Sequence, residues 1–234
     1  MLKVRVFLFL ILVSICGVRA EEDVASLEKR AAGGDAEAQL ALGSIYDEGR
    51  GVPKDQLKAV EWFLKSAMQG NAQAQFFIGA LYANGQGLPK DDRKAIEWYE
   101  KSAAQGVVDA QFNLGVMYAG GRGVPKDPAK AAEWYEKAAL QGLTRAQFNL
   151  GLMNLAGQGV PKDVLRGYAW FAVAAADGDP AAIKNRDFIE KQFEAKRLAE
   201  IKADKIAGSK AAEKPDMKAE GQKLARELAA KIKR

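Results

Sequence analysis

The side chains best suited to acid-base chemistry are carboxylate and lysine pairs that recur along the chain. The pairs are four residues apart and comprise Glu61/Lys65, Glu97/Lys101 and Glu133/Lys137. A carboxylate beside an ammonium group can exchange protons with a substrate. The same spacing is also that of stabilising ion pairs on an exposed helix face, which are worth about 0.2–0.5 kcal/mol each. We therefore interpret the three pairs as structural and predict no catalytic residue among them.

The composition removes the other common catalytic arrangements. The chain of 234 residues has no histidine and a single cysteine, Cys16. Without histidine it has no Ser-His-Asp or Cys-His nucleophile, no usual zinc site and no usual general base for neutral pH. We predict a protein that is not an enzyme and that holds neither a metal ion nor a cofactor.

Two further patterns resemble ligand sites. The first is a tryptophan column, which suggests stacking surfaces for sugars and consists of Trp62, Trp98, Trp134 and Trp170. Each tryptophan lies in the apolar stripe of a predicted helix, which favours a place in the core. The second pattern is a set of Gly-x-Gly loops such as residues 121–123. No strand precedes these loops and neither Lys-Ser nor Lys-Thr follows them, so we predict no phosphate site.

The first 20 residues have the features of a secretory signal peptide. Lys3 and Arg5 precede an apolar run over residues 6–13, and Ala20 ends the segment before three acidic residues. The run is shorter than the ~20 residues that a spanning helix needs. We expect cleavage after Ala20, no integral membrane span afterwards, and a periplasmic or secreted protein. A lipoprotein attached through Cys16 is a minor alternative, because the preceding residue is isoleucine rather than a small residue.

The charge of the mature chain is nearly balanced. Removing the first 20 residues leaves 32 basic and 30 acidic side chains, so we expect no nucleic-acid partner. Residues 196–234 are basic, with 12 basic and 6 acidic side chains. Such an end suits a membrane surface or an acidic partner. The narrow apolar stripe of Leu224, Leu228 and Ile232 instead favours a helix that docks on the rest of the protein.

An internal repeat of 36 residues determines the predicted fold. The tryptophan column keeps this spacing, and glycine, glutamine and aspartate columns keep it too. These columns are Gly34/Gly70/Gly106/Gly142/Gly178, Gln39/Gln75/Gln111/Gln147 and Asp55/Asp91/Asp127/Asp163. A period in this range is typical of solenoids and other repeat arrays.

Each unit predicts a pair of helices. In the first unit, apolar residues at helical spacing predict one helix over residues 35–48 and a second over residues 56–69. Between them, Gly49 permits a positive φ and Asp55 can cap the second helix. Gly43 and its equivalents stand inside the first helix, where glycine costs about 1 kcal/mol relative to alanine. We therefore expect a close approach between helices at this column.

The second unit carries the most informative motif. Residues 70–82 read Gly-Asn-Ala-x-Ala-Gln-x-x-Ile-Gly-x-x-Tyr, and Trp98-Tyr99 follows before Lys101-Ser102-Ala103. This combination resembles the Sel-one-like repeat (SLR), a relative of the tetratricopeptide repeat. The resemblance covers residues 34–178 and implies an all-α fold, a right-handed α/α solenoid of four SLR helix pairs.

The repeat register divides the chain into segments. We predict a signal peptide at 1–20, an N-terminal capping half-repeat at 21–33, repeats at 34–69, 70–105, 106–141 and 142–177, and C-terminal capping helices with a basic tail at 179–234. The fourth unit departs most, since Asn154 replaces the column's tyrosine and Val173 replaces its lysine, as suits a last repeat before a cap. A flexible break is predicted at 206–217.

Positions that differ between repeats are the candidates for partner contacts. By analogy with tetratricopeptide domains, the outward positions of each first helix line a concave groove. The predicted partner-binding residues are Leu40, Asp47, Gln73, Phe76, Phe77, Asp109, Phe112, Asn113, Arg145, Phe148 and Asn149. Phe76, Phe112 and Phe148 recur at the repeat spacing, and they either form an exposed aromatic row or pack between neighbouring helices.

Binding is therefore the expected function. The resemblance implies a non-enzymatic protein-interaction scaffold or adaptor in the bacterial periplasm or outside the cell, and we expect a monomer that binds a protein or peptide. An immunity or inhibitor protein that neutralises a secreted toxin, such as a lipase, is the alternative. The resemblance also links a cysteine-rich branch to β-lactam hydrolysis, but these repeats have no cysteine. A role in the endoplasmic reticulum is disfavoured because the chain has no Asn-x-Ser/Thr sequon.

Overall fold

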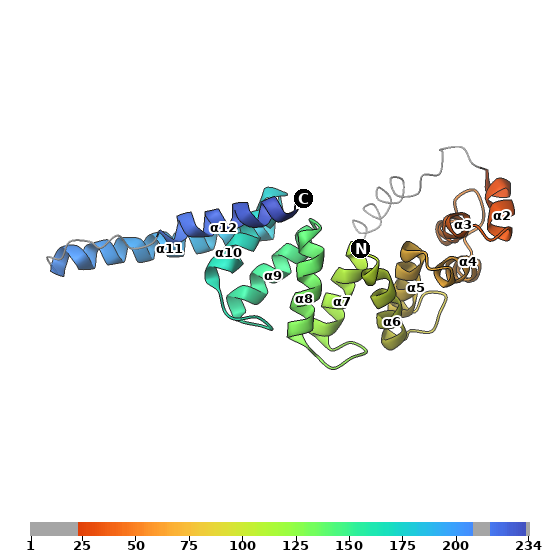
Figure 1. Ribbon diagram of the computed structural model, residues 1–234, viewed down its shortest axis with the longest axis horizontal. Coiled ribbons are helices and arrows are strands. Elements are labelled where there is room, and N and C mark those ends of the chain that lie inside the picture. The colour runs from red at the N-terminus through yellow and green to blue at the C-terminus, as the bar shows by residue number, and fades with distance from the viewer. Residues whose placement is uncertain (1–22, 208–215, 233–234) are drawn as a thin grey trace. The chain divides into compact units, whose positions relative to one another are not determined.

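The computed structural model describes residues 23–207 and 216–232, and these residues form helices joined by short loops without a strand. The predicted signal peptide, its cleavage site and Cys16 lie outside the described residues, as does the segment 208–215 within the predicted break. Figure 1 shows the order of the helices along the chain.

The described helices follow one another as antiparallel pairs. They are α2 (Val24–Ala32), α3 (Ala36–Glu48), α4 (Gln56–Met68), α5 (Ala72–Asn84), α6 (Asp92–Ala104), α7 (Val108–Gly120), α8 (Pro128–Leu140), α9 (Thr144–Ala156), α10 (Val164–Ala176), α11 (Pro180–Ala207) and α12 (Met217–Ile232). Contacts divide the chain into two compact units, residues 1–110 and 111–234, so the division falls within α7.

The loops within the pairs follow the predicted local chemistry. Asp55 has an extended backbone and its carboxylate accepts hydrogen bonds from the amides of Leu57 and Lys58, which caps α4. Gly49 ends α3 in the left-handed region with φ of 74°. Pro128 occupies the start of α8, where its missing N–H leaves no helix hydrogen bond unmade. Capping residues therefore set the helix ends within one residue of the predicted bounds.

The glycine inside each first helix permits contact with an aromatic ring of the second. A Cβ added at Gly43 would lie 2.5 Å from Cδ1 of Phe63, and one at Gly79 would lie 2.7 Å from Cδ1 of Tyr99. The same relation holds in the second unit, where Gly115 faces Tyr135. The expected close approach is confirmed, and its partner is the aromatic residue that follows each tryptophan.

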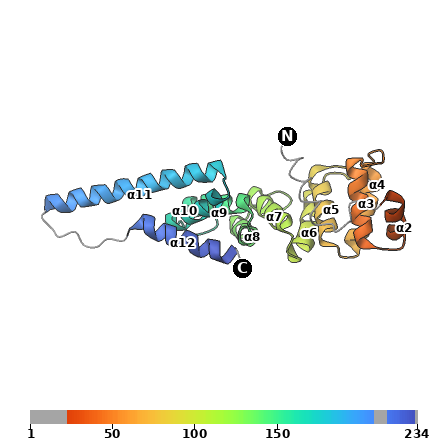
Figure 2. The ribbon, with the colours of Figure 1, turned by 90° about the horizontal axis from the view of Figure 1, so that it is seen from above.

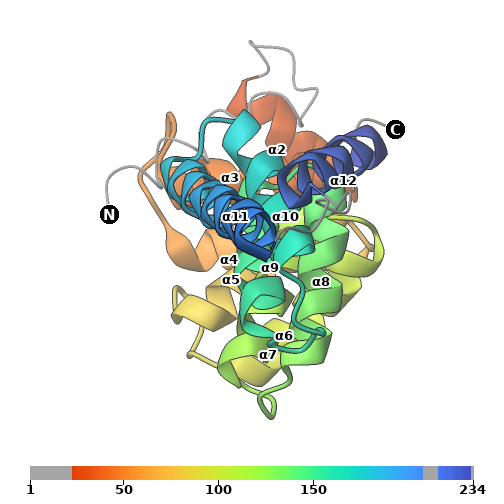
Figure 3. The ribbon, with the colours of Figure 1, turned by 90° about the vertical axis from the view of Figure 1, so that its left-hand side faces the viewer.

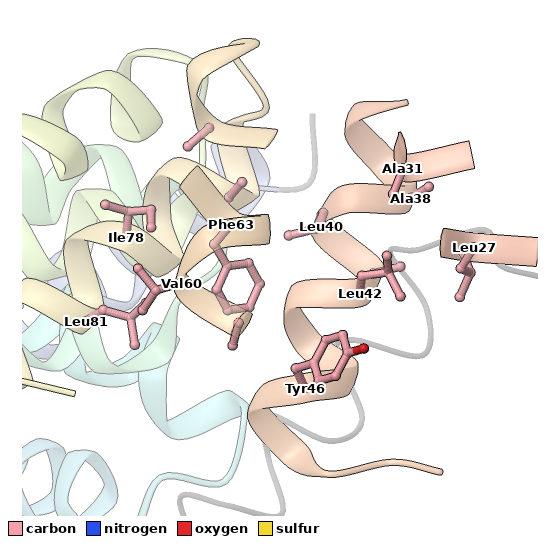
Figure 4. Packing of buried hydrophobic residues seen from close by; sticks show 14 residues of the cluster. Leu27, Ala31, Ala38, Leu40, Leu42, Tyr46, Val60, Phe63, Ile78 and Leu81 are labelled. Atoms are coloured by element: carbon pink, nitrogen blue, oxygen red, sulfur yellow. The ribbon is translucent and has the colours of Figure 1, made fainter. Parts of the chain in front are cut away.

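The core of the first unit begins at α2. Leu27 and Ala31 are buried against α3, and they cover the apolar side of the first helix pair. Phe63 from α4 lies between Leu42 of α3 and Ile78 of α5 (Figure 4). Burial of each such large apolar side chain contributes roughly 1.5–3 kcal/mol. The first unit thus has a continuous apolar core that starts at α2, the first helix of the described residues.

Amide side chains tie the two helices of each pair together. The Nε2 of Gln69 donates to Oε1 of Gln39 at 2.7 Å, and Gln105 donates to Gln75 at 2.8 Å. In the second unit Gln141 donates to Gln111 at 2.8 Å. In the first three repeats, the buried glutamine of the first helix thus makes the same hydrogen bond with the glutamine that ends the second helix. This contact explains why glutamine recurs at a buried position.

Two helices, α11 and α12, cover the end of the second unit. Both α11 and α12 pack on α10, on different sides of it (Figures 2 and 3). Trp170 and Phe171 of α10 are fully buried, and Leu228 of α12 is buried as the predicted docking stripe requires. Tyr168 occupies the space that a side chain at Gly221 would need, so α12 approaches α10 closely. Of the two departures of the fourth repeat named above, Val173 lies on this covered helix and Asn154 is buried on α9.

Candidate protein-interaction surface

The three recurring phenylalanines are half-buried, with each ring against an aromatic ring of the following helix. The ring centroids lie 5.8 Å apart for Phe76 and Tyr99, 5.6 Å for Phe112 and Tyr135, and 5.5 Å for Phe148 and Phe171. Aromatic pairs at such separations are favourable beyond the area they bury. Each phenylalanine therefore anchors a helix pair and also presents part of its ring to solvent, so the two readings of this column are both partly correct.

In the first unit, the aromatic residues gather at the start of α5. Phe77 stacks on Phe63 with centroids 4.9 Å apart, and Phe76 lies 5.6 Å from Phe77. Gln73 is half-buried one turn earlier on the same helix. This part of α5 offers an apolar surface with an amide beside it.

In the second unit, the candidate residues lie on α7 and α9. The guanidinium of Arg145 lies 4.7 Å from the centre of the Phe112 ring, which is a cation–π contact. A hydrogen bond joins Asn149 to the Tyr135 hydroxyl, and burial raises the pKa of this tyrosine. The tyrosine is therefore neutral near pH 7 and serves to hold the asparagine in place.

We call one set of side chains the α7–α9 face. It comprises Phe112, Asn113, Arg145, Phe148, Asn149 and Leu152. Arg145 is exposed, and Leu152 leaves 42% of its surface to solvent although it is apolar. The face combines part-exposed rings, amides and one guanidinium, which suits recognition of a peptide through apolar anchors with polar edges. Leu152 lies on α9 together with Arg145, Phe148 and Asn149.

One predicted groove residue does not face solvent. Leu40 occupies the same column as Phe76 but is only 2% exposed and belongs to the core of the first unit. The leucine side chain, which is smaller than phenylalanine, is buried between the helices. The prediction that Leu40 faces the groove is therefore wrong. Asp47 and Asp109 are half-buried at the end of α3 and the start of α7.

The tryptophan column differs from the predicted core position in three of four repeats. Trp62, Trp98 and Trp134 are half-buried, and a lysine three residues later lies over each ring. For Trp62, the ammonium of Lys65 is 4.1 Å from the ring centre. The lysines therefore cover indole faces, as long side chains with apolar stems can. Trp170 alone is fully buried, because α10 is covered and Val173 replaces the lysine.

Two features are absent from the described part of the chain. Across residues 23–207 and 216–232, no three carboxylates or thiols come together as metal ligands would. In the same ranges, no helix has both the length and the apolar character required to cross a bilayer.

Comparison with known proteins identifies the repeat. The model of the Sel1 repeat matches four segments, residues 36–71, 72–107, 108–143 and 144–179. These segments cover more than half of the chain, so the protein belongs to the Sel1 repeat family. They begin two residues after the units drawn from the glycine column, at the first residue of each leading helix. A search of curated proteins finds no match.

Two solved structures resemble the whole repeat region. One is a protective antigen of uropathogenic Escherichia coli with an SLR fold, at 28% identity and a TM-score of 0.70, covering 90% of this chain and 49% of that protein. The other is a Sel1 repeat protein from Oxalobacter formigenes, at 34% identity and a TM-score of 0.66, covering 73% and 51%. The chain thus spans about half the length of each. The all-α SLR fold is confirmed, and proteins of this family generally serve as protein-interaction scaffolds.

Proposed function

We propose that the protein is a non-enzymatic scaffold that binds a protein or peptide partner through the outward side of its leading helices, in the bacterial periplasm or outside the cell. The observation that carries the proposal is the α7–α9 face. There, Arg145 lies over the Phe112 ring and Leu152 is exposed within the same unit. Repeated columns build the helix pairs, whereas these positions vary between repeats and leave apolar surface open to a partner.

The face suits a peptide better than a small metabolite. Its apolar side chains are spread over two helices, and its amides and guanidinium lie on the same two helices. Such a surface anchors alternate side chains of a peptide, while the polar groups set its register. The guanidinium favours a carboxylate on the partner, because arginine binds carboxylates in a bidentate manner.

The proposed location rests on the sequence of the first 20 residues. A basic start, a short apolar run and a small residue before an acidic segment are typical of export. The relative from uropathogenic Escherichia coli is a protective antigen, which is consistent with a protein outside the cytoplasm. We propose a bacterial envelope or secreted protein on these grounds.

Affinity capture tests the proposal. The full chain would be used to capture proteins from an envelope extract, beside a double variant, Arg145→Glu with Leu152→Asp, that changes only the α7–α9 face. Both side chains are exposed, so we expect the helical circular dichroism to be unchanged. The expected result is one dominant partner that the variant captures at least about tenfold less, the loss that 1.4 kcal/mol of binding energy gives.

A matched control has the same chemical changes on other helices. Leu57→Asp with Arg93→Glu alters an exposed leucine and an exposed arginine on α4 and α6. This control should capture the partner as the unaltered chain does. Equal capture by all three proteins would overturn the assignment of the face. If the captured partner is a toxin or a secreted hydrolase, loss of its activity on binding would identify the protein as its inhibitor.

A further inference from the structure

A second surface of unexplained chemistry lies on α11. Six side chains at alternating steps of four and three residues are all exposed, and they are Lys184, Phe188, Lys191, Ala195, Leu198 and Lys202. We call this set the α11 stripe. Phe188 leaves 62% of its surface to solvent and Leu198 leaves 59%, which is unusual for large apolar side chains. The far part of α11 extends beyond the other described helices of the second unit (Figures 1 and 2).

The acidic side chains beside the stripe already have cationic partners. Asp187 forms an ion pair with Arg186 at 2.6 Å, and Glu194 pairs with Lys218 of α12 at 2.9 Å. The opposite side of α11 is used as well, because Ile189 and Phe193 are buried in the core against α10. The stripe thus presents two large apolar groups and three ammonium groups that these carboxylates do not neutralise.

The spacing of the stripe favours a helix as its partner. A repeat of alternating four and three residues keeps one seam on a helix, as in a two-stranded coiled coil. The stripe is narrow, whereas a helix that lies in a membrane surface needs a broad apolar face. A second copy of α11 would place every lysine of the stripe against its equivalent in a parallel pair, and Lys184 against Lys202 in an antiparallel pair. Like charges at such contacts are destabilising.

We propose that the α11 stripe docks an acidic amphipathic helix of a partner protein. The apolar side chains of that helix cover Phe188, Ala195 and Leu198, and its carboxylates pair with Lys184, Lys191 and Lys202. Charge complementarity selects the partner, because the stripe has three cations and its adjacent anions are occupied. This surface lies on a different helix from the α7–α9 face, so either surface can operate without the other.

A designed peptide tests the proposal directly. The probe is a helical peptide of about three heptads with glutamate opposite the lysines and leucine opposite the other positions, made in both chain directions. The full chain should bind one direction saturably, and binding should weaken as salt is added. A scrambled peptide of the same composition should bind at least about tenfold more weakly, a difference of 1.4 kcal/mol.

Two variants and their controls locate the binding. Lys184→Glu with Lys191→Glu and Lys202→Glu reverses the charge of the stripe, and Phe188→Ser with Leu198→Ser removes its apolar groups. Each should weaken binding by about tenfold or more, whereas Lys223→Glu and Met68→Ser, which alter exposed residues elsewhere, should change it by less than about twofold. Binding of neither peptide direction would overturn the proposal. So would preferred binding to phosphatidylglycerol vesicles, or self-association of the chain that the stripe variants abolish.

Discussion

At Gly79, we expect the steric cost of adding a Cβ to exceed the gain in helix propensity. Alanine is the better helix former by about 1 kcal/mol. Its Cβ would nevertheless lie 2.7 Å from the Tyr99 ring and 3.2 Å from the carbonyl oxygen of Ala95. We expect Gly79→Ala to lower the free energy of unfolding by about 1–3 kcal/mol, as overpacking does. Urea unfolding followed by circular dichroism measures this change.

A second substitution serves as the control for Gly79→Ala. Tyr99→Leu removes the ring that the new Cβ meets, so the double variant should lose less stability than the sum of the two single variants. An unchanged or raised free energy of unfolding in Gly79→Ala alone would contradict the close approach of α5 and α6.

The hydrogen bond between glutamines that recurs in the first three repeats is missing in the fourth. Gln147 is the last buried glutamine of the glutamine column, and its Oε1 has no hydrogen-bond donor within the described part of the chain. The residue that supplies the donor in earlier repeats is here Asp177, which instead accepts a hydrogen bond from Thr144 at 3.0 Å. Asp177→Gln restores the donor and should raise the free energy of unfolding by about 0.5–1.5 kcal/mol.

Chemical denaturation of Asp177→Gln beside Asp177→Glu checks this prediction. Glutamate has the length of glutamine but no N–H donor when ionised. Only the glutamine variant should be stabilised. Equal effects of both substitutions would mean that side-chain length, rather than the missing hydrogen bond, limits the fourth repeat.

At the scale of elements, the helices differ in how their first turn is capped. Asp35 caps α3 and Asn71 caps α5 through side-chain hydrogen bonds, but Leu143 precedes α9 and makes no such bond. Leu143→Asn would give α9 the cap that α5 has. We expect the free energy of unfolding to rise by about 0.5–2 kcal/mol, the usual value of an N-cap.

Thermal unfolding of Leu143→Asn measures this gain, and Leu143→Ala is the matched control without a capping group. The alanine variant should be no more stable than the unaltered chain, because alanine is a poor N-cap. If both variants lose stability alike, packing of the leucine outweighs the missing cap.

The docking of α11 on α10 depends on a tyrosine that must keep its proton. Burial raises the pKa of Tyr168 to about 12, and the hydroxyl donates a hydrogen bond to Glu190 at 2.6 Å. The pKa of Lys218 is also raised, by its hydrogen bonds to Glu194 and Glu190. In both groups the folded state holds the proton more tightly than the unfolded chain. Their contributions are therefore complete below the ordinary pKa values and decline above them.

The free energy of unfolding should consequently fall as the pH rises from about 10 to about 12. Tyr168→Phe should reduce this fall, because phenylalanine has no proton to lose. The part of the pH dependence that comes from Lys218 should remain. Urea unfolding across this pH range measures both proteins. An identical pH dependence in the two would show that Tyr168 does not couple α10 to α11 in this way.

At the scale of the whole chain, the repeat period was enough to predict the fold. Columns such as the aspartate caps and the helical glycines recur because every helix pair needs the same local chemistry, so their roles could be inferred from spacing. The narrow apolar stripe of the last helix likewise predicted that Leu228 lies on a docking helix. These features depend on contacts within or between adjacent helices, which a period of 36 residues reports directly.

The candidate surface was less predictable, because the repeat period gives equivalent positions but not their exposure to solvent. A shared column indicates that two positions are equivalent in the repeat, but it does not indicate how deeply each side chain is buried. Leu40 and Phe76 share a column, yet the leucine is buried and the phenylalanine is half-exposed. The lysines over the tryptophan rings and the α11 stripe depend on side-chain directions and on which helices remain uncovered, and neither follows from the repeat alone.

Hydroxyl-radical footprinting of the full chain, free and bound to its captured partner, tests partner binding by the α7–α9 face without any substitution. We expect Phe112, Phe148 and Leu152 to become protected in the complex, while exposed Leu57 and Met68, at 67% and 79% exposure, react as before. Protection of Leu57 and Met68 with unchanged reactivity of the α7–α9 face would contradict partner binding by this face.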